Sequence, residues 1–140
     1  MSQISEIMST DVRVIEPQET LRRAAEMMVR LDVGALPVVT DNQLMGMLTD
    51  RDIVVRGVAA GLSPDAGCVS DVMTREVLYC TADQDTREVL ELMGEKQVRR
   101  LPVVDDDRHL VGIVSIGDLA LNEPDDVGPA VSEISEPDKH

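Results

Sequence analysis

The chain has 140 residues, a formal net charge of −14 at pH 7 and a sequence pI near 4.3. Phosphate backbones and anionic membranes repel such a chain, and one Tyr with no Phe or Trp provides no stacking platform for single-stranded nucleic acid. We therefore expect neither a nucleic-acid partner nor a membrane partner.

The composition predicts an aliphatic core and a cytoplasmic protein. The apolar fraction of 43% is ordinary for a globular protein, and eight Met are most simply core-filling residues. The N-terminal segment resembles no secretory signal, and no stretch reaches the apolar length of a membrane span. Cys68 and Cys80 are too few for a disulfide framework.

The first predicted unit, residues 1–62, combines short strands with two helices. Thr20 is the expected N-cap of its first helix, and Gly61 with Pro64 should end the last one. The predicted elements are a strand at 12–15, a helix at 21–31, hairpin strands at 36–39 and 44–48, and a helix at about 50–60.

The second unit, residues 63–121, repeats this pattern. Residues 4–9 reappear 65 positions later, and the shift becomes 66 when Gly46 is matched with Gly112, so the second copy has one extra residue in its hairpin turn. Asp85 and Glu88 resemble a reciprocal cap of the equivalent helix. The duplication predicts an α+β fold of two β-α-β-β-α units related by a pseudo-two-fold axis, with helices covering small mixed sheets.

Residues 122–140 differ from both units. They contain three Pro among Asp, Glu and Ser, with a single Lys. Low hydrophobicity combined with net charge predicts a mostly disordered acidic tail.

No signature of an enzyme active site is found. The chain lacks H-E-x-x-H, G-x-S-x-G, C-x-x-C and a phosphate-binding glycine loop. His109 and His140 make a poor metal site, and the aspartate run 105–107 lacks the spacing and the distal Glu of a calcium loop. Cys68 and Cys80 are more simply small apolar residues than a redox pair. We expect no enzyme, no metal and no resident cofactor.

The informative positions are two junctions between a predicted strand and a predicted helix, with Thr49 and Asp52 at one and Ser115 and Asp118 at the other. A helix N-terminus carries unpaired N–H groups and a positive dipole end, so it can hold an anion. The S/T-x-x-D pattern is also a helix cap, which is the simpler interpretation on spacing alone. Its repetition at matching places, each after a glycine-containing strand, favours two related binding sites.

Arginines are distributed unequally between the junctions. Arg51 lies between Thr49 and Asp52, whereas the matching residue of the second copy is Gly117. Arg99 and Arg100 precede the second Leu-Pro pair and have no counterpart in the first copy. The guanidinium fork suits a phosphate, although solvent-exposed arginines that balance an acidic surface are the alternative.

These motifs resemble the cystathionine-β-synthase (CBS) domain, and they do so twice. The resemblance rests on residues 34–39 with 46–53, and on 98–104 with 112–119, and covers about residues 4–121. Free-standing bacterial CBS pairs are the most similar members. The resemblance implies a Bateman module that commonly forms a homodimer and binds an adenosyl ligand, such as AMP, ADP, ATP or S-adenosylmethionine, between its two units.

Roles carry over from this resemblance position by position. Thr49 and Asp52 match the hydroxyl and carboxylate that hold ribose and phosphate at one site, and Ser115 and Asp118 match them at the other. The loops expected to offer backbone polar groups to the base are Ala35, Leu36 and Pro37 in one unit and Arg100, Leu101 and Pro102 in the other. The residues expected to wall the base pocket are Val12, Val14, Val77 and Tyr79.

Departures from the family pattern make the two sites unequal, and we expect at most one of them to be a good nucleotide site. Many relatives have Thr where this chain has Val14 and Tyr79, although the Tyr79 ring could stack on an adenine. The sequence thus predicts a regulatory module that senses an adenosyl ligand, with a role in stress or energy sensing. The alternative is a ligand-free dimeric scaffold that docks an unidentified protein partner.

Overall fold

The computed structural model describes residues 2–121 and residue 134, so the tail predicted at 122–140 lies outside the described residues apart from that one position. The chain divides into two compact units. One, called here the central unit, is Arg13–Val77, and the other, the terminal unit, joins Met1–Val12 to Leu78–His140. No helix of the described residues is long and apolar enough to cross a membrane.

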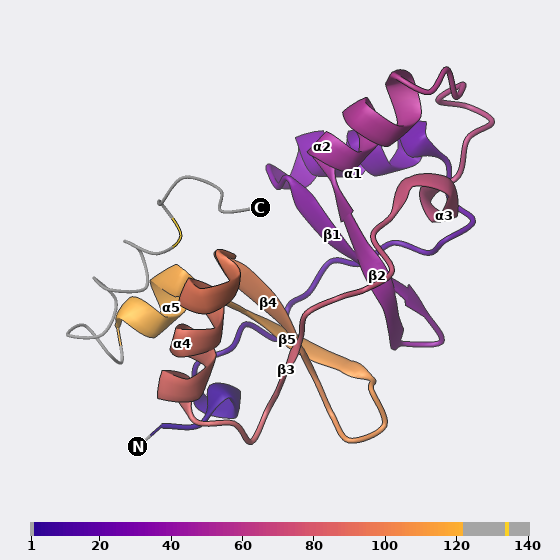
Figure 1. The fold of residues 1–140 in the computed structure, drawn as a ribbon. Helices are drawn as coiled ribbons and strands as arrows, with labels where there is room; N and C mark the ends of the chain where they lie inside the picture. Colours follow the sequence, from indigo (N-terminus) through magenta and orange to yellow (C-terminus); the bar gives the residue numbers. More distant parts are fainter. Residues whose placement is uncertain (1, 122–133, 135–140) are drawn as a thin grey trace. The chain divides into compact units, whose positions relative to one another are not determined.

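The central unit holds a two-stranded antiparallel hairpin with helices gathered at one end of it (Figure 1). In place of the strand predicted at 12–15, the structure has an isolated bridge at Ile15. The N–H of Ile15 donates to the Pro37 carbonyl, and its own carbonyl accepts from the N–H of Val39, both at 3.0 Å. The elements are α1 (Leu21–Leu31), β1 (Ala35–Thr40), β2 (Gln43–Thr49), α2 (Asp50–Asp52), the π-helix η2 (Ile53–Val58) and α3 (Val69–Val72).

Helix α1 confirms its predicted cap and apolar face. Oγ1 of Thr20 accepts a hydrogen bond from the N–H of Arg23 at 3.1 Å, and Leu21, Ala24 and Met28 are buried at helical spacing. The helix predicted at 50–60 is only briefly α-helical, because α2 passes into η2 after three residues. The turn ends at Gly61, whose φ of +81° favours glycine.

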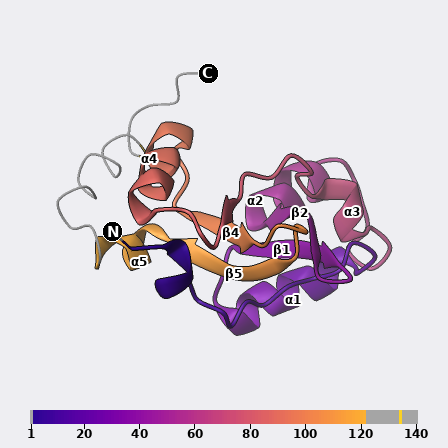
Figure 2. The same ribbon diagram turned by 90° about the horizontal axis from the view of Figure 1, so that it is seen from below.

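The terminal unit holds a mixed three-stranded sheet in the order β3-β4-β5, seen from another side in Figure 2. Strand β3 pairs in parallel with β4, and β5 returns antiparallel to it. The Asp85 carboxylate caps α4 through the N–H of Arg87 at 2.9 Å, so the predicted reciprocal cap with Glu88 does not form. The elements are η1 (Ile4–Glu6), β3 (Cys80–Thr81), α4 (Thr86–Lys96), β4 (Arg100–Val104), β5 (Leu110–Ser115) and α5 (Ile116–Ala120).

The opening segment of each sequence repeat packs on the sheet of the other repeat. Thr74 exchanges two backbone hydrogen bonds of 2.9 Å with Met47 on β2, and Ser9 exchanges two with Ile113 on β5. The compact units therefore cut across the repeats. The boundaries predicted at 62 and 63 describe the sequence duplication and stay a prediction.

Each unit has its own aliphatic core, and together they confirm the α+β class with small sheets and helices. Strand β2 shows the alternation of a half-buried hairpin, because Leu44, Gly46 and Leu48 are buried while Met45 is exposed. The terminal core is built from Ile4, Cys80, Val89, Leu90, Met93, Leu101, Val103, Val114 and Leu119.

Candidate functional site

Both predicted junctions form complete capping boxes. At the end of β2, Oγ1 of Thr49 accepts from the N–H of Asp52 at 3.0 Å, and Oδ2 of Asp52 accepts from the N–H of Thr49 at 3.0 Å. At the end of β5, Ser115 and Asp118 form the same pair of bonds at 3.1 and 2.9 Å. The capping interpretation is therefore confirmed at both junctions.

Each cap uses only one of the two carboxylate oxygens. Within the described residues, Oδ1 of Asp52 and Oδ1 of Asp118 have no hydrogen-bond partner, and no buried side-chain polar atom is left unpaired. These oxygens are consequently accessible to solvent. An ionised carboxylate offers about four acceptor positions, so a capping Asp can still accept from a ligand hydroxyl.

The hairpins place further predicted residues beside the caps. Ala35 lies directly opposite Thr49 in the β1–β2 pair, and Arg100 lies opposite Ser115 in the β4–β5 pair. The N–H of Asp50 donates to the Gly34 carbonyl at 3.0 Å. Sequence-distant positions at each junction thus come together within a single hairpin.

The two Leu-Pro segments lie in strands β1 and β4, which confirms the strand predicted at 36–39, and both pair along their length with the returning strand. The ligand contacts that the resemblance assigns to these segments stay a prediction. Leu36 and Leu101 are buried in the two cores, and the Pro37 carbonyl already accepts from the N–H of Ile15.

The three arginines near the junctions are exposed. Within the described residues, the guanidinium groups of Arg51, Arg99 and Arg100 have no side-chain partner. They can therefore reach an anion without first breaking an ion pair. Arg51 lies in α2 at the Thr49 junction. The other two arginines lie beside the Ser115 junction, where the backbone carbonyl of Arg99 accepts from the N–H of Ile116 at 2.8 Å.

The predicted wall residues are divided between the two units. Val14 and Val77 belong to the central unit, whereas Val12 and Tyr79 belong to the terminal unit. Tyr79 is 41% exposed, and the guanidinium carbon of Arg108 lies 5.2 Å from the centre of its ring. A cation therefore already stacks on this ring, at a distance typical of a cation–π contact.

The cysteines are free, and the structure fits a packing role for Cys80. Its side chain is buried in the terminal core, and this burial raises the pKa of the Cys80 thiol to about 12. A thiol with that pKa is protonated at neutral pH and a weak nucleophile. Cys68 is half-buried at the start of α3.

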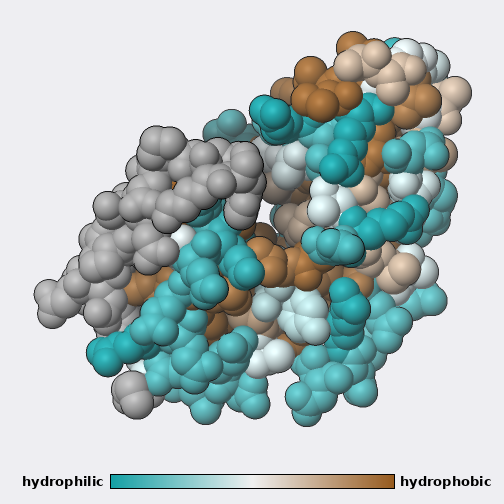
Figure 3. All heavy atoms as spheres, in the orientation of Figure 1, coloured by the Kyte–Doolittle hydropathy of each residue, from teal (hydrophilic) through white to brown (hydrophobic). Residues whose placement is uncertain are grey.

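Two features were not predicted from the sequence. One is an apolar surface on the central unit, where Val29, Val54 and Val58 are 83%, 58% and 63% exposed; hydrophobic residues gather over α1 and η2 in Figure 3. The other is a side-chain cluster of Asp105, Asp107 and His109. A sequence signal for the cluster exists in the alternation Asp-x-Asp-x-His across a predicted turn.

The chain is similar to a known domain family and to several known proteins. The family model described as "CBS domain" matches residues 4–57 and 69–123. A CBS domain-containing protein of Bacillus subtilis, YhcV, is 40% identical over 100% of both chains. Hypoxic response protein 1 of Mycobacterium tuberculosis is 42% identical over 89% of this chain and 87% of its own. An inosine-5'-monophosphate dehydrogenase of Methanocaldococcus jannaschii matches through only 22% of its length.

Several solved structures have a fold similar to that of this chain. Hypoxic response protein I with two coordinated zinc ions superposes with a TM-score of 0.79 at 41% identity, covering 87% of this chain and 99% of that one. CBSX2 in complex with AMP gives 0.77 at 28% identity, covering 89% and 98%. The CBS domain pair of protein MJ0100 with 5'-methylthioadenosine and S-adenosyl-L-methionine gives 0.74 at 25% identity, covering 89% and 98%.

Proposed function

The chain belongs to the CBS-domain family, and from that premise we propose that it is a regulatory module that binds an adenosyl ligand at its two capped junctions. The observation that carries the proposal is the free Oδ1 of Asp52 and of Asp118 beside exposed arginines. Solved relatives with AMP, and with methylthioadenosine and S-adenosylmethionine, supply the ligand class.

The chemistry of each junction suits ribose and phosphate. In the proposed complex, Oδ1 of the capping Asp accepts from ribose hydroxyls, while the adjacent N-terminal backbone and an arginine attract the phosphate. Neither cap has to break. The Thr49 junction contributes Arg51, and the Ser115 junction contributes Arg99 and Arg100, so the two sites should differ in affinity.

We further propose that two copies associate through the apolar surface of α1 and η2. Isolated exposed valines need no explanation, but Val29, Val54 and Val58 flank shallow apolar hollows on either side of Ile53. A ligand that favours one packing of the module would shift the dimer equilibrium, which a protein partner could read. Such a shift is limited by the difference in ligand affinity between the two states.

Isothermal titration calorimetry with AMP, ATP and S-adenosylmethionine tests ligand binding. Asp52→Asn keeps an amide oxygen for the cap but removes the charge and one acceptor, so it should weaken binding at its own site about tenfold or more. The matched control is Asp71→Asn, because Asp71 caps α3 through the N–H of Cys68 at 2.9 Å but lies outside the proposed site. Absence of heat with all three ligands would reject the proposal.

The ligand-free dimeric scaffold remains the second candidate, since both junction patterns are complete caps without any ligand. A specific ligand stabilises the folded state by mass action, whereas a scaffold has a melting temperature that no nucleotide changes. Thermal unfolding with and without each adenosyl compound therefore separates the two.

A further inference from the structure

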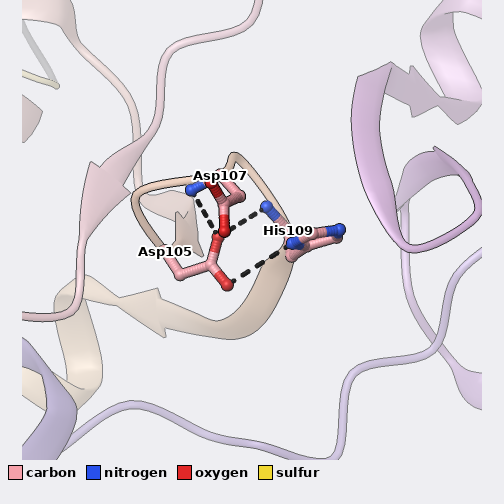
Figure 4. Close-up of side chains that lie close together, drawn as sticks. All are labelled: Asp105, Asp107 and His109. Atoms are coloured by element: carbon pink, nitrogen blue, oxygen red, sulfur yellow. Dashed lines mark hydrogen bonds and ion pairs between the residues drawn. The ribbon is translucent and has the colours of Figure 1, made fainter.

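The turn between β4 and β5 gathers two carboxylates and an imidazole on one side of the hairpin (Figure 4). Asp105, Asp107 and His109 alternate along the chain, and one ligand atom from each lies within 4.8 Å of the other two. Nδ1 of His109 is 3.5 Å from Oδ2 of Asp105. Unlike a run of acidic side chains alone, this set includes a nitrogen donor that faces the oxygens.

The backbone of the turn fixes the direction of Asp105. Its Oδ1 accepts from the N–H groups of Asp107 and His109 at 2.9 Å each, and its N–H donates to the His109 carbonyl at 3.0 Å. Oδ2 is thereby left facing the imidazole. The N–H of His109, which donates to Oδ1, holds the pKa of Asp105 below its ordinary value.

The one strong cation of the turn is directed to an aromatic ring. Arg108 has a φ of 67°, and its guanidinium carbon lies 5.2 Å from the centre of the Tyr79 ring. Arg108, which separates Asp107 from His109 along the chain, therefore packs on the residue just before β3. It does not lie between the side chains of Asp107 and His109. The turn keeps a concentration of negative charge in residues 105–107.

We propose that Asp105, Asp107 and His109 bind a divalent transition-metal ion of the zinc type, with water completing its coordination. One imidazole nitrogen with two carboxylate oxygens suits Zn²⁺ and similar ions, whereas Ca²⁺ and Mg²⁺ prefer oxygen ligands throughout. The matching turn of the first repeat, residues 40–43, has a single carboxylate and no imidazole. The site therefore belongs to the second half alone.

Calorimetry of the full chain, stripped of metal by a chelator and titrated with ZnCl₂, tests this site. We expect about one Zn²⁺ per chain, as for a site with three protein ligands. His109→Ala and Asp107→Asn should each weaken binding at least about tenfold. Asp106→Asn is the matched control, because it removes one charge from the same turn outside the cluster and should leave the affinity unchanged.

A second readout identifies the ligand atoms. Co²⁺ in the site should show d–d absorption without an intense thiolate charge-transfer band, because no cysteine belongs to the cluster. A thiolate band would place the ion on Cys68, and unchanged affinity in His109→Ala would place it elsewhere, so either result overturns the proposal. Failure of the wild-type chain to bind Zn²⁺ or Co²⁺ does so as well. Circular dichroism of each variant confirms that it is folded.

Discussion

Asp52 has both a structural and a binding role in the proposed function. Its Oδ2 takes part in the cap with Thr49, while its Oδ1 stays accessible to a ligand. The reciprocal bonds of 3.0 Å between Thr49 and Asp52 hold the Asp52 carboxylate in one position before any ligand arrives. A preorganised acceptor loses less conformational freedom on binding than a mobile one. Structural and binding roles are therefore separable by substitution only when the cap is preserved.

Removing the cap should cost stability irrespective of any ligand. Thr49→Ala deletes the acceptor for the N–H of Asp52, and loss of such a cap typically destabilises a protein by about 1 kcal/mol. Thr49→Ser retains the acceptor and should remain close to the wild type. Urea denaturation of the three proteins measures the difference, and equal midpoints for Ala and Ser would contradict the capping role.

The two thiols should differ in reactivity. Burial raises the Cys80 pKa to about 12, so below that pH the thiol stays protonated and shielded in the folded protein, while half-buried Cys68 is accessible. Brief iodoacetamide treatment of the native protein near pH 8 should modify Cys68 alone. Peptide mass spectrometry locates the label, and treatment in urea should label both. Equal native labelling would mean that the terminal core opens readily.

At the scale of elements, the closest packing occurs where an opening segment crosses a strand glycine. A Cβ added at Gly46 would lie 2.5 Å from the Thr74 carbonyl oxygen, and one added at Gly112 would lie 2.9 Å from that of Ser9. These carbonyls are held in place because they accept from the strand N–H groups of Met47 and Ile113. Both crossings therefore require glycine, which explains its repetition in the sequence.

Gly46→Ala should consequently destabilise the central unit by about 1–3 kcal/mol, the usual cost of forced overpacking. Gly117→Ala is the control, since the added Cβ in α5 would meet only Oγ of Ser115 at 3.6 Å and alanine favours a helix. Chemical denaturation monitored by circular dichroism gives both values. A neutral Gly46→Ala would show that the Thr74 segment can move away from β2.

The sequence supports prediction of elements better than of their partners. Thr20, the apolar spacing of α1 and the turn at Asp41 and Asn42 are local signals, and the structure confirms the helix and the hairpin. The exchange of Ser9 and Thr74 between repeats depends on contacts far apart in sequence, which no periodicity reports. The break from α2 into η2 was likewise hidden, because Ile53–Val58 reads as an ordinary apolar helix.

The candidate site was predictable to a similar extent. The S/T-x-x-D spacing located both junctions and their capping, while the direction of each free oxygen required coordinates. In the sequence, His109 and the aspartate run 105–107 were judged separately, and each alone makes a poor metal site. Only the folded hairpin shows the imidazole facing Asp105 and the guanidinium stacked on Tyr79.

At the scale of the whole molecule, the net charge opposes association of two copies, whereas the apolar surface of α1 and η2 favours it. A net charge of −14 keeps copies apart through mutual repulsion, which salt screens. On α1 and η2, Arg30 and Arg56 are exposed near the valines, whereas Arg22 pairs with Asp65 and Glu26 is also exposed on α1. The exposed arginines reduce the repulsion that two acidic copies meet at this surface.

The proposed dimer should depend on this surface. Val54→Asp places a charge where 58% of the side chain is exposed, so it should leave the fold intact but convert dimers to monomers at micromolar concentration, as burial of an unpaired charge at an interface is costly. Met45→Asp provides the control, because Met45 is 41% exposed on β2, away from α1 and η2. Size-exclusion chromatography with light scattering reports the mass directly. Dimers that persist in Val54→Asp but dissociate in Met45→Asp would assign the interface to the hairpin instead, and a monomeric wild type would exclude it altogether.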